Sequence, residues 1–145
     1  QDFKVIVDYA HTPDSLIAIY EAFPNGQRIA VLGSCGGGRD KWKRKEMMEI
    51  AEKYCEKIIL TDEDPYEDNP REIVDDLVRY LKNKKPEIIM DRREAIAKAI
   101  KYAKSGDAVI ITGKGTDPYI MRANGAKEKW SDAEVAKEEL NKLFR

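Results

Sequence analysis

The sequence has few of the residues and segments that mark several functional classes. It contains one histidine, His11, and two cysteines, Cys35 and Cys55, whose spacing is not that of a metal clip. A multi-histidine metal site is therefore excluded, and so few cysteines are typical of a reduced, cytosolic protein. No apolar run approaches the roughly 20 residues that cross a bilayer. The formal net charge of -1 gives no overall bias toward nucleic acid or membranes as partners.

The first residues, Gln1-Asp2-Phe3-Lys4, include no methionine and do not have the form of a signal peptide. We therefore expect an excised domain. The chain has 145 residues, of which 42% are hydrophobic. This length and composition predict one globular domain, large enough to have its own core.

Short apolar runs alternate with amphipathic segments along the chain. Strands are predicted at residues 4–7, 28–32, 58–60, 87–90 and 107–112, and helices at 15–23, 41–54, 70–81, 91–103 and 131–144. This alternation predicts an α/β, Rossmann-like fold, with a mostly parallel, doubly wound sheet and helices on both faces. Residues 119–130, with a turn at Asn124-Gly125, predict a C-terminal hairpin or an antiparallel edge strand.

The unusual polar residues and most glycines follow the predicted strands. The connections from helix to strand are short and contain few such residues. In such folds the loops after the strands meet at the carboxyl edge of the sheet, where ligands bind. The sequence therefore predicts a ligand site at that edge.

A glycine loop, residues 33–38, follows the second predicted strand. It lacks the dinucleotide fingerprint, because Cys35 stands where a glycine is needed, and it lacks the closing Lys-Ser or Lys-Thr of a P-loop. The basic residues that follow oppose the helix dipole, so they indicate either a bound anion or a solvated charged face. These residues are Arg39, Lys41, Lys43, Arg44 and Lys45. Lys114, between two glycines, is likewise either an anion contact or a solvent-facing turn residue.

An acidic loop, residues 61–70, carries five carboxylates after the third predicted strand. It is able to hold a hard cation, cap the next helix or receive a positively charged substrate. It lacks the ligand spacing and central glycine of an EF-hand, so a metal site is not the favoured interpretation. His11 has no evident partner for general-base catalysis, and we expect it to pack or to contact a ligand.

Five motifs in this order resemble the C-terminal domain of the Mur ligases over nearly the whole chain. They are residues 8–15 (Asp-Tyr-Ala-His-Thr-Pro-Asp-Ser), 36–40 with 43–44, 61–70, 91–96 (Asp-Arg-Arg-Glu-Ala-Ile) and 113–115 (Gly-Lys-Gly). Within that family they are most similar to the UDP-N-acetylmuramoyl-tripeptide synthetases (MurE), which add the third residue of the peptidoglycan stem peptide.

The resemblance implies an ATP-dependent amide ligase of the bacterial cytoplasm that acts in cell-wall synthesis. It also implies that the full protein is a monomer, of which this chain is one excised domain. ATP phosphorylates the γ-carboxylate of D-Glu in UDP-MurNAc-L-Ala-D-Glu, and the amine of a free amino acid then attacks. In the family, the P-loop, the Mg²⁺ ligands and a carbamylated lysine lie in a central domain, after an N-terminal UDP-binding domain. Residues 1–145 would be the C-terminal domain alone, with no metal ligands and no catalytic residue, and therefore inactive by itself.

The resemblance also implies residue roles. Asp8, with Tyr9 and His11 nearby, matches a position that approaches ATP. Arg39 matches the arginine that holds the α-carboxylate of the incoming amino acid. Gly113 and Asp117 match positions that touch this amino acid, although the family's Gly-Lys-Gly-His-Glu becomes Gly-Lys-Gly-Thr-Asp here. Three further cations are possible anion contacts: Lys43, Arg44 and Lys114.

The acidic loop departs most from the family pattern. Diaminopimelate-adding members carry Asp-Asn-Pro-Arg, whose arginine pairs with the distal carboxylate of that substrate, whereas this chain has Glu63-Asp64-Pro65-Tyr66. Losing the arginine would leave that carboxylate unpaired, and the added acid favours an ammonium group. We therefore predict a basic diamino acid, L-lysine or ornithine. A one-residue slip in the alignment would exchange Glu63 and Asp64. Two alternatives remain: a non-catalytic nucleotide- or amino-acid-binding module, and another amide ligase of the superfamily.

Overall fold

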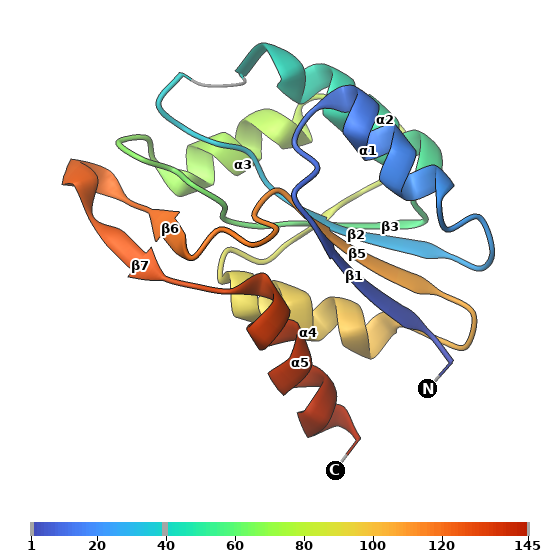
Figure 1. Cartoon of the computed structure of the whole chain (residues 1–145). Helices are drawn as coiled ribbons and strands as arrows, with labels where there is room; N and C mark the ends of the chain where they lie inside the picture. The colour runs from blue at the N-terminus through green and yellow to red at the C-terminus, as the bar shows by residue number, and fades with distance from the viewer. Residues whose placement is uncertain (1, 39–40, 145) are drawn as a thin grey trace.

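The computed structural model describes residues 2–38 and 41–144, and Arg39 lies outside them. Its centre is a five-stranded sheet in the order β1-β5-β2-β3-β4, with every neighbouring pair parallel (Figure 1). The strands are β1 (Lys4–Asp8), β2 (Arg28–Leu32), β3 (Lys57–Leu60), β4 (Glu87–Ile88) and β5 (Ala108–Thr112). The predicted α/β class and parallel sheet are confirmed.

Helices cover both faces of this sheet (Figure 1). They are α1 (Pro13–Glu21), α2 (Arg44–Tyr54), α3 (Pro70–Val78), α4 (Arg92–Tyr102) and α5 (Asp132–Leu143). Buried side chains of α1, α2 and α3 form one hydrophobic core, and those of α4 and α5 form another on the opposite face. All five residues of β5 are buried, because helices cover it on both faces and β1 and β2 flank it.

The helix starts follow local capping chemistry. The Thr12 hydroxyl oxygen accepts a hydrogen bond from the Ser15 backbone N–H, and the Thr12 N–H in turn donates to the Ser15 hydroxyl oxygen, so α1 begins with a reciprocal cap. Asn69, Asp91 and Ser131 cap α3, α4 and α5 with their side chains. These caps fix where each loop at the carboxyl edge ends and its helix begins.

Residues after β5 form the predicted hairpin as a separate two-stranded sheet, not as an edge strand of the main sheet. β6 (Tyr119–Met121) pairs antiparallel with β7 (Lys127–Lys129). The connection contains a short 3₁₀ turn, η2 (Ala123–Gly125), with Asn124 at φ 60°. The left-handed conformation needed there explains the Asn-Gly pair. Figure 1 shows the hairpin projecting from the sheet beside the loop that precedes α3.

Several predicted elements differ in their bounds. The helix expected over residues 15–23 is α1 at Pro13–Glu21, and the helix expected over residues 70–81 ends at Val78. The helix expected from residue 41 begins as a 3₁₀ turn, η1 (Lys41–Lys43), and becomes α-helical only at Arg44. The fourth strand, expected over residues 87–90, ends at Ile88, because β4 is an edge strand that pairs only with the end of β3.

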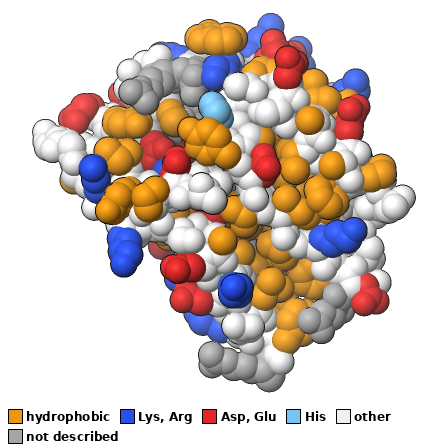
Figure 2. Space-filling view, viewed as in Figure 1, with side chains coloured by type: hydrophobic (Ala, Val, Ile, Leu, Met, Phe, Trp, Pro, Cys, Tyr) orange, Lys and Arg blue, Asp and Glu red, His pale blue; other side chains and the backbone are white. Residues whose placement is uncertain are grey.

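The other edge strand, β1, is only half-buried, and Figure 2 shows hydrophobic side chains gathered over this side of the molecule. None of the described helices is long and apolar enough to cross a membrane.

Candidate functional site

The loops at the carboxyl ends of β1, β2, β3 and β5 surround a cavity of about 390 Å³. Its walls are formed by Tyr9, His11, Cys35, Glu63, Asp64, Tyr66, Gly113 and Asp117. All of these except Cys35 are nucleotide or amino-acid contacts that the sequence predicts. The structure therefore brings most of the predicted residues to one place.

Close backbone contacts join these loops. The N–H of Gly36 donates to the carbonyl of Asp64 at 2.8 Å, and the N–H of Gly113 donates to the carbonyl of Asp8 at 3.2 Å. A Cβ at Gly36 would lie 2.0 Å from the carbonyl oxygen of Pro65, so only glycine allows the glycine loop and the acidic loop to approach this closely. Pro65, also predicted to bind substrate, thus supports the wall through its backbone.

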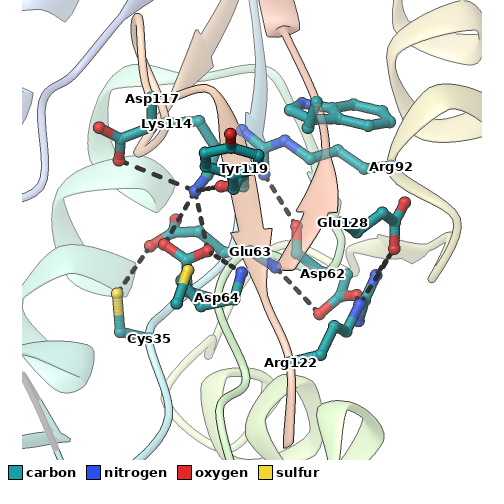
Figure 3. Close-up of polar contacts among 12 residues, drawn as sticks. Cys35, Asp62, Glu63, Asp64, Arg92, Lys114, Asp117, Tyr119, Arg122 and Glu128 are labelled. Atoms are coloured by element: carbon teal, nitrogen blue, oxygen red, sulfur yellow. Dashed lines mark hydrogen bonds and ion pairs between the residues drawn. The ribbon is translucent and has the colours of Figure 1, made fainter. Parts of the chain in front are cut away.

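Asp64 forms an ion pair inside the protein (Figure 3). The Lys114 ammonium donates to both of its carboxylate oxygens, at 2.8 and 2.9 Å, and the Met121 N–H donates to one of them at 2.9 Å. Lys114 also donates to the carbonyl of Tyr119 at 2.6 Å, and its side chain is 1% exposed. The charge of Asp64 is therefore compensated by Lys114. Of the predicted anion contacts, Lys114 does bind an anion, but that anion is Asp64.

Glu63, the neighbouring residue, has a different environment. Its carboxylate accepts a hydrogen bond from the Cys35 thiol at 3.3 Å and faces the cavity. Burial raises the pKa of Glu63 above its usual range, and the charge of Arg92 opposes this shift without cancelling it. A Cβ at Gly113 would lie 2.1 Å from Glu63 Oε1, so the glycine leaves room for the carboxylate. The two adjacent acids thus differ in their partners, because Asp64 pairs with a buried ammonium and Glu63 accepts a hydrogen bond from a thiol.

Three potential metal ligands lie together in the cavity wall. Among the described residues, ligand atoms of Cys35, Glu63 and Asp64 lie within 4.8 Å of one another. The Lys114 ammonium already lies at hydrogen-bond distance from both Asp64 oxygens. A metal cation there would be repelled at close range, so this donor set does not fit Mg²⁺.

Arg44, predicted as an anion contact, has a structural role instead. Its guanidinium donates to the Ser34 hydroxyl at 3.0 Å, to the Cys35 carbonyl at 2.8 Å and to the Asp76 carboxylate at 3.0 Å. Because these partners satisfy a side chain that is only 4% exposed, Arg44 holds the glycine loop against α2 and α3. Lys43 is also largely buried, with its ammonium 5.5 Å from the centre of the Trp42 ring.

The ATP-side candidates form one rim of the cavity. The rings of Tyr9 and His11 meet edge to face with centres 4.5 Å apart, and His11 Nδ1 lies 3.1 Å from the Tyr9 carbonyl oxygen. Asp8 directly precedes Tyr9, and its carboxylate accepts a hydrogen bond from the Ala10 N–H at 2.8 Å. Asp117 stands at the same rim, 42% exposed and 3.7 Å from the Lys114 ammonium.

Two features of the site were missed from the sequence. The sequence marks Arg92 only as part of a motif, yet its side chain is buried and contacts the carbonyls of two of the loops. A cation in the first turn of a helix opposes the dipole, and this signal could have drawn attention to it. The second feature is the conformation of Tyr66, which has φ of 52°, an unusual value for a bulky residue and one that often marks a functional loop.

Comparisons with known proteins identify relatives of this chain. The sequence profile of the family "Mur ligase, glutamate ligase domain" matches residues 1–115. The chain is 44% identical over 142 residues to the UDP-N-acetylmuramoyl-L-alanyl-D-glutamate--2,6-diaminopimelate ligase of Aquifex aeolicus, covering 95% of this chain and 29% of that protein. It is 42% identical over 143 residues to the protein of the same name in Bacillus cereus, covering 97% of this chain and 29% of the relative.

A solved structure of a ligase with this name superimposes with a TM-score of 0.90 at 32% identity, covering 100% of this chain and 30% of that one. The chain thus spans about three tenths of the length of these relatives. The fold, the profile and the identity to the diaminopimelate ligases together show that the chain belongs to the Mur ligase family, as a C-terminal, glutamate ligase domain of the MurE type.

Proposed function

We propose that this chain is the C-terminal domain of an ATP-dependent ligase that adds the third amino acid to UDP-MurNAc-L-Ala-D-Glu. Relatives that match nearly the whole chain carry the name of that reaction. The observation that carries the proposal is the cavity at the carboxyl edge, where an acidic wall can receive the amino group of an incoming amino acid.

In this proposal the residues of the chain bind and orient, and the rest of the protein activates the acid. ATP supplies the phosphoryl group that turns the D-Glu carboxylate into an acylating agent, with the Mg²⁺ ligands outside this domain. Glu63 orients the amino acid through an ammonium group, and Arg39 binds its α-carboxylate. Asp8, Tyr9 and His11 lie toward the nucleotide. Holding amine and acyl group together accounts for much of the rate gain in reactions of this type.

The cavity favours a basic diamino acid, L-lysine or ornithine. Lys and Arg are absent from the described residues that line it, and the nearest buried cation, Lys114, is paired with Asp64. A distal carboxylate would meet the acids Glu63 and Asp117 and the phenol side chain of Tyr66. A distal ammonium would meet complementary charge.

The alternative amino acid is meso-diaminopimelate, and the names of the relatives favour it. Those names do not bear on Tyr66, where this chain lacks the arginine expected of a diaminopimelate site. Tyr66→Arg should restore affinity for the distal carboxylate if the missing arginine is the cause of the preference.

The test uses the full-length protein that contains this chain, with ATP, UDP-MurNAc-L-Ala-D-Glu and each amino acid in turn. We expect release of ADP with formation of a tripeptide product, identified by mass. Glu63→Gln should raise the KM for the amino acid at least about tenfold while leaving the KM for ATP unchanged, because it removes the charge that faces the ammonium. Absence of tripeptide with every amino acid would overturn the proposed function.

A further inference from the structure

Arg92 is a fully buried cation in the first turn of α4, and its side chain is 1% exposed. Its guanidinium forms two bonds with Asp132, Nε to Oδ1 and Nη2 to Oδ2, both 2.8 Å long. The other donations go to backbone carbonyls, from Nη1 to Asp62 at 2.8 Å and from Nη2 to Thr112 at 3.0 Å. One side chain therefore joins α4, α5 and the ends of β3 and β5.

The two carbonyls lie directly before residues of the cavity wall. Asp62 precedes Glu63, and Thr112 precedes Gly113. Glu63 Oε1 lies so close to the Gly113 backbone that a Cβ there would be 2.1 Å away. The separation of these two loops thus sets where the Glu63 carboxylate lies in the cavity.

The other side of Arg92 is held by a second set of contacts. Asp132 is 0% exposed, and its Oδ1 also accepts a hydrogen bond from the indole N–H of Trp130 at 2.7 Å. The paired charges leave the planar guanidinium in one orientation, with two donors aimed at the strand ends. A lysine ammonium, a single point of charge, cannot satisfy Asp132 and two separate carbonyls with this geometry.

We propose that Arg92 is a positioning residue for amino-acid selection: it holds the loops after β3 and β5 at the separation that presents the Glu63 carboxylate to the substrate amine. This inference rests on the proposed function, because it assumes that the cavity receives an amino acid. Misplacement of a group in an active site by about 1 Å can lower a rate by about 100-fold, so a buried side chain that sets the positions of two loops can change how well the substrate is held.

The charge of Arg92 also acts on Glu63. Burial raises the pKa of Glu63 and Asp64 adds to this, whereas Arg92, the Cys35 thiol and Lys114 lower it. Among the influences that lower the pKa, Arg92 is the largest. Arg92 therefore helps to keep the carboxylate ionised for an ammonium ligand.

The test compares Arg92→Lys with Arg93→Lys in the full-length enzyme. Arg93 is the adjacent residue on α4, is 40% exposed and pairs with Glu138 and Glu139 on α5, so it is a matched control outside the cavity. We expect Arg92→Lys to raise the KM for the amino acid about tenfold or more, with the KM for ATP unchanged. Arg93→Lys should leave both unchanged. Equal effects of the two variants on the amino-acid KM would overturn the proposal.

A second readout separates positioning from stability. Arg92→Gln removes the charge, which should raise the pKa of Glu63 further and move the acid limb of kcat/KM for the amino acid to higher pH. Arg92→Lys keeps the charge and should move that limb less. A residue with a purely structural role would leave the limb in place, and that result would contradict the inference.

Folding of each variant is checked by circular dichroism and thermal unfolding. If Arg92→Lys does not fold, Asp132→Asn is used instead. This variant keeps Arg92 but removes the charge that pairs with its guanidinium, and it should also raise the KM for the amino acid. Loss of folding in both variants would assign Arg92 to stability alone and overturn the proposal. Absence of ligation by the wild-type enzyme would overturn the proposed function, whereas wild-type ligation with an unaltered amino-acid KM in the variants would overturn only the role of Arg92.

Discussion

Glu63 and Asp64 are adjacent acids whose carboxylates have different partners. Asp64 points to Lys114 and the hairpin, where an ammonium and a backbone N–H satisfy it. Glu63 points to the cavity, beside the Cys35 thiol and the Gly113 backbone. The sequence alone could not say which of them faces substrate, because a slip of one residue exchanges them. The contacts of the two side chains favour Glu63.

The two cysteines should differ in reactivity. Cys55 is buried, and its burial raises the pKa of its thiol to about 12. Cys35 is half-buried and lines the cavity. Because thiolate is the reactive form, we expect one thiol to react with Ellman's reagent in the native protein and a second only after unfolding. Cys35→Ser should abolish the native reaction, and native labelling that persists in this variant would contradict the assignment.

Glu52 of α2 holds the turn after α3 in place through hydrogen bonds. Its carboxylate accepts hydrogen bonds from the N–H groups of Lys82, Asn83 and Lys84, at 3.0, 2.6 and 2.8 Å. Burial acts to raise the pKa of Glu52, but these bonds and the Lys84 charge outweigh it and lower the pKa overall. A lowered folded-state pKa means that the stabilisation is complete above the pKa of the unfolded chain and is lost as pH falls through the folded value.

We therefore expect Glu52→Ala to lower the free energy of unfolding by about 1 kcal/mol at pH 7, after allowance for the partial exposure of the site. The difference from wild type should shrink as pH falls below the usual carboxyl range. The measurement is urea unfolding at pH 7 and at about pH 3, with Glu49→Ala on the exposed side of α2 as the control. An equal loss at both pH values would show that the carboxylate charge is not responsible.

At the scale of elements, the β6–β7 hairpin is fastened to the acidic loop. The Met121 N–H donates to Asp64, the Met121 carbonyl accepts from the Tyr66 N–H at 3.1 Å, and the Asn124 N–H donates to Glu67 at 2.6 Å. Arg122 adds an ion pair with Asp62. The hairpin has a mostly exposed surface, so these polar contacts, more than a core of its own, hold it in place.

Asp64→Ala should therefore destabilise the domain and release the hairpin. It leaves Lys114 buried without its close counter-ion, at a cost of about 3 kcal/mol. Asp117→Ala, which removes the exposed acid 3.7 Å from the same ammonium, should cost less than about 1 kcal/mol. Chemical unfolding measures both values, and hydrogen exchange should show faster exchange of the β6–β7 amides in Asp64→Ala only. Similar losses in the two variants would contradict the assigned partner of Lys114.

At the scale of the whole molecule, the order of strands and helices could be predicted because hydrophobic periodicity and turn residues are local signals. For example, the continuous apolar run Ala-Val-Ile-Ile predicts that β5 is buried on both faces. The partners of charged residues could not be predicted in this way. Lys114 and Asp64 are 50 positions apart, and Arg44 meets Asp76 across 32 positions. Such pairs depend on how the loops pack together. From the sequence alone, cations that pair within the protein, such as Lys114 and Arg44, cannot be told from cations that bind a ligand anion.

The complete protein is required for the decisive test, since this chain spans about three tenths of its relatives. The measurement is competition among equal concentrations of L-lysine, L-ornithine and meso-diaminopimelate for ligation to UDP-MurNAc-L-Ala-D-Glu by the full-length enzyme, with products resolved by mass. Among the described residues, the cavity lining is acidic and holds no lysine or arginine for a distal carboxylate, which predicts lysine or ornithine product in excess by more than about tenfold. A dominant diaminopimelate product would contradict this account of Glu63 and Tyr66.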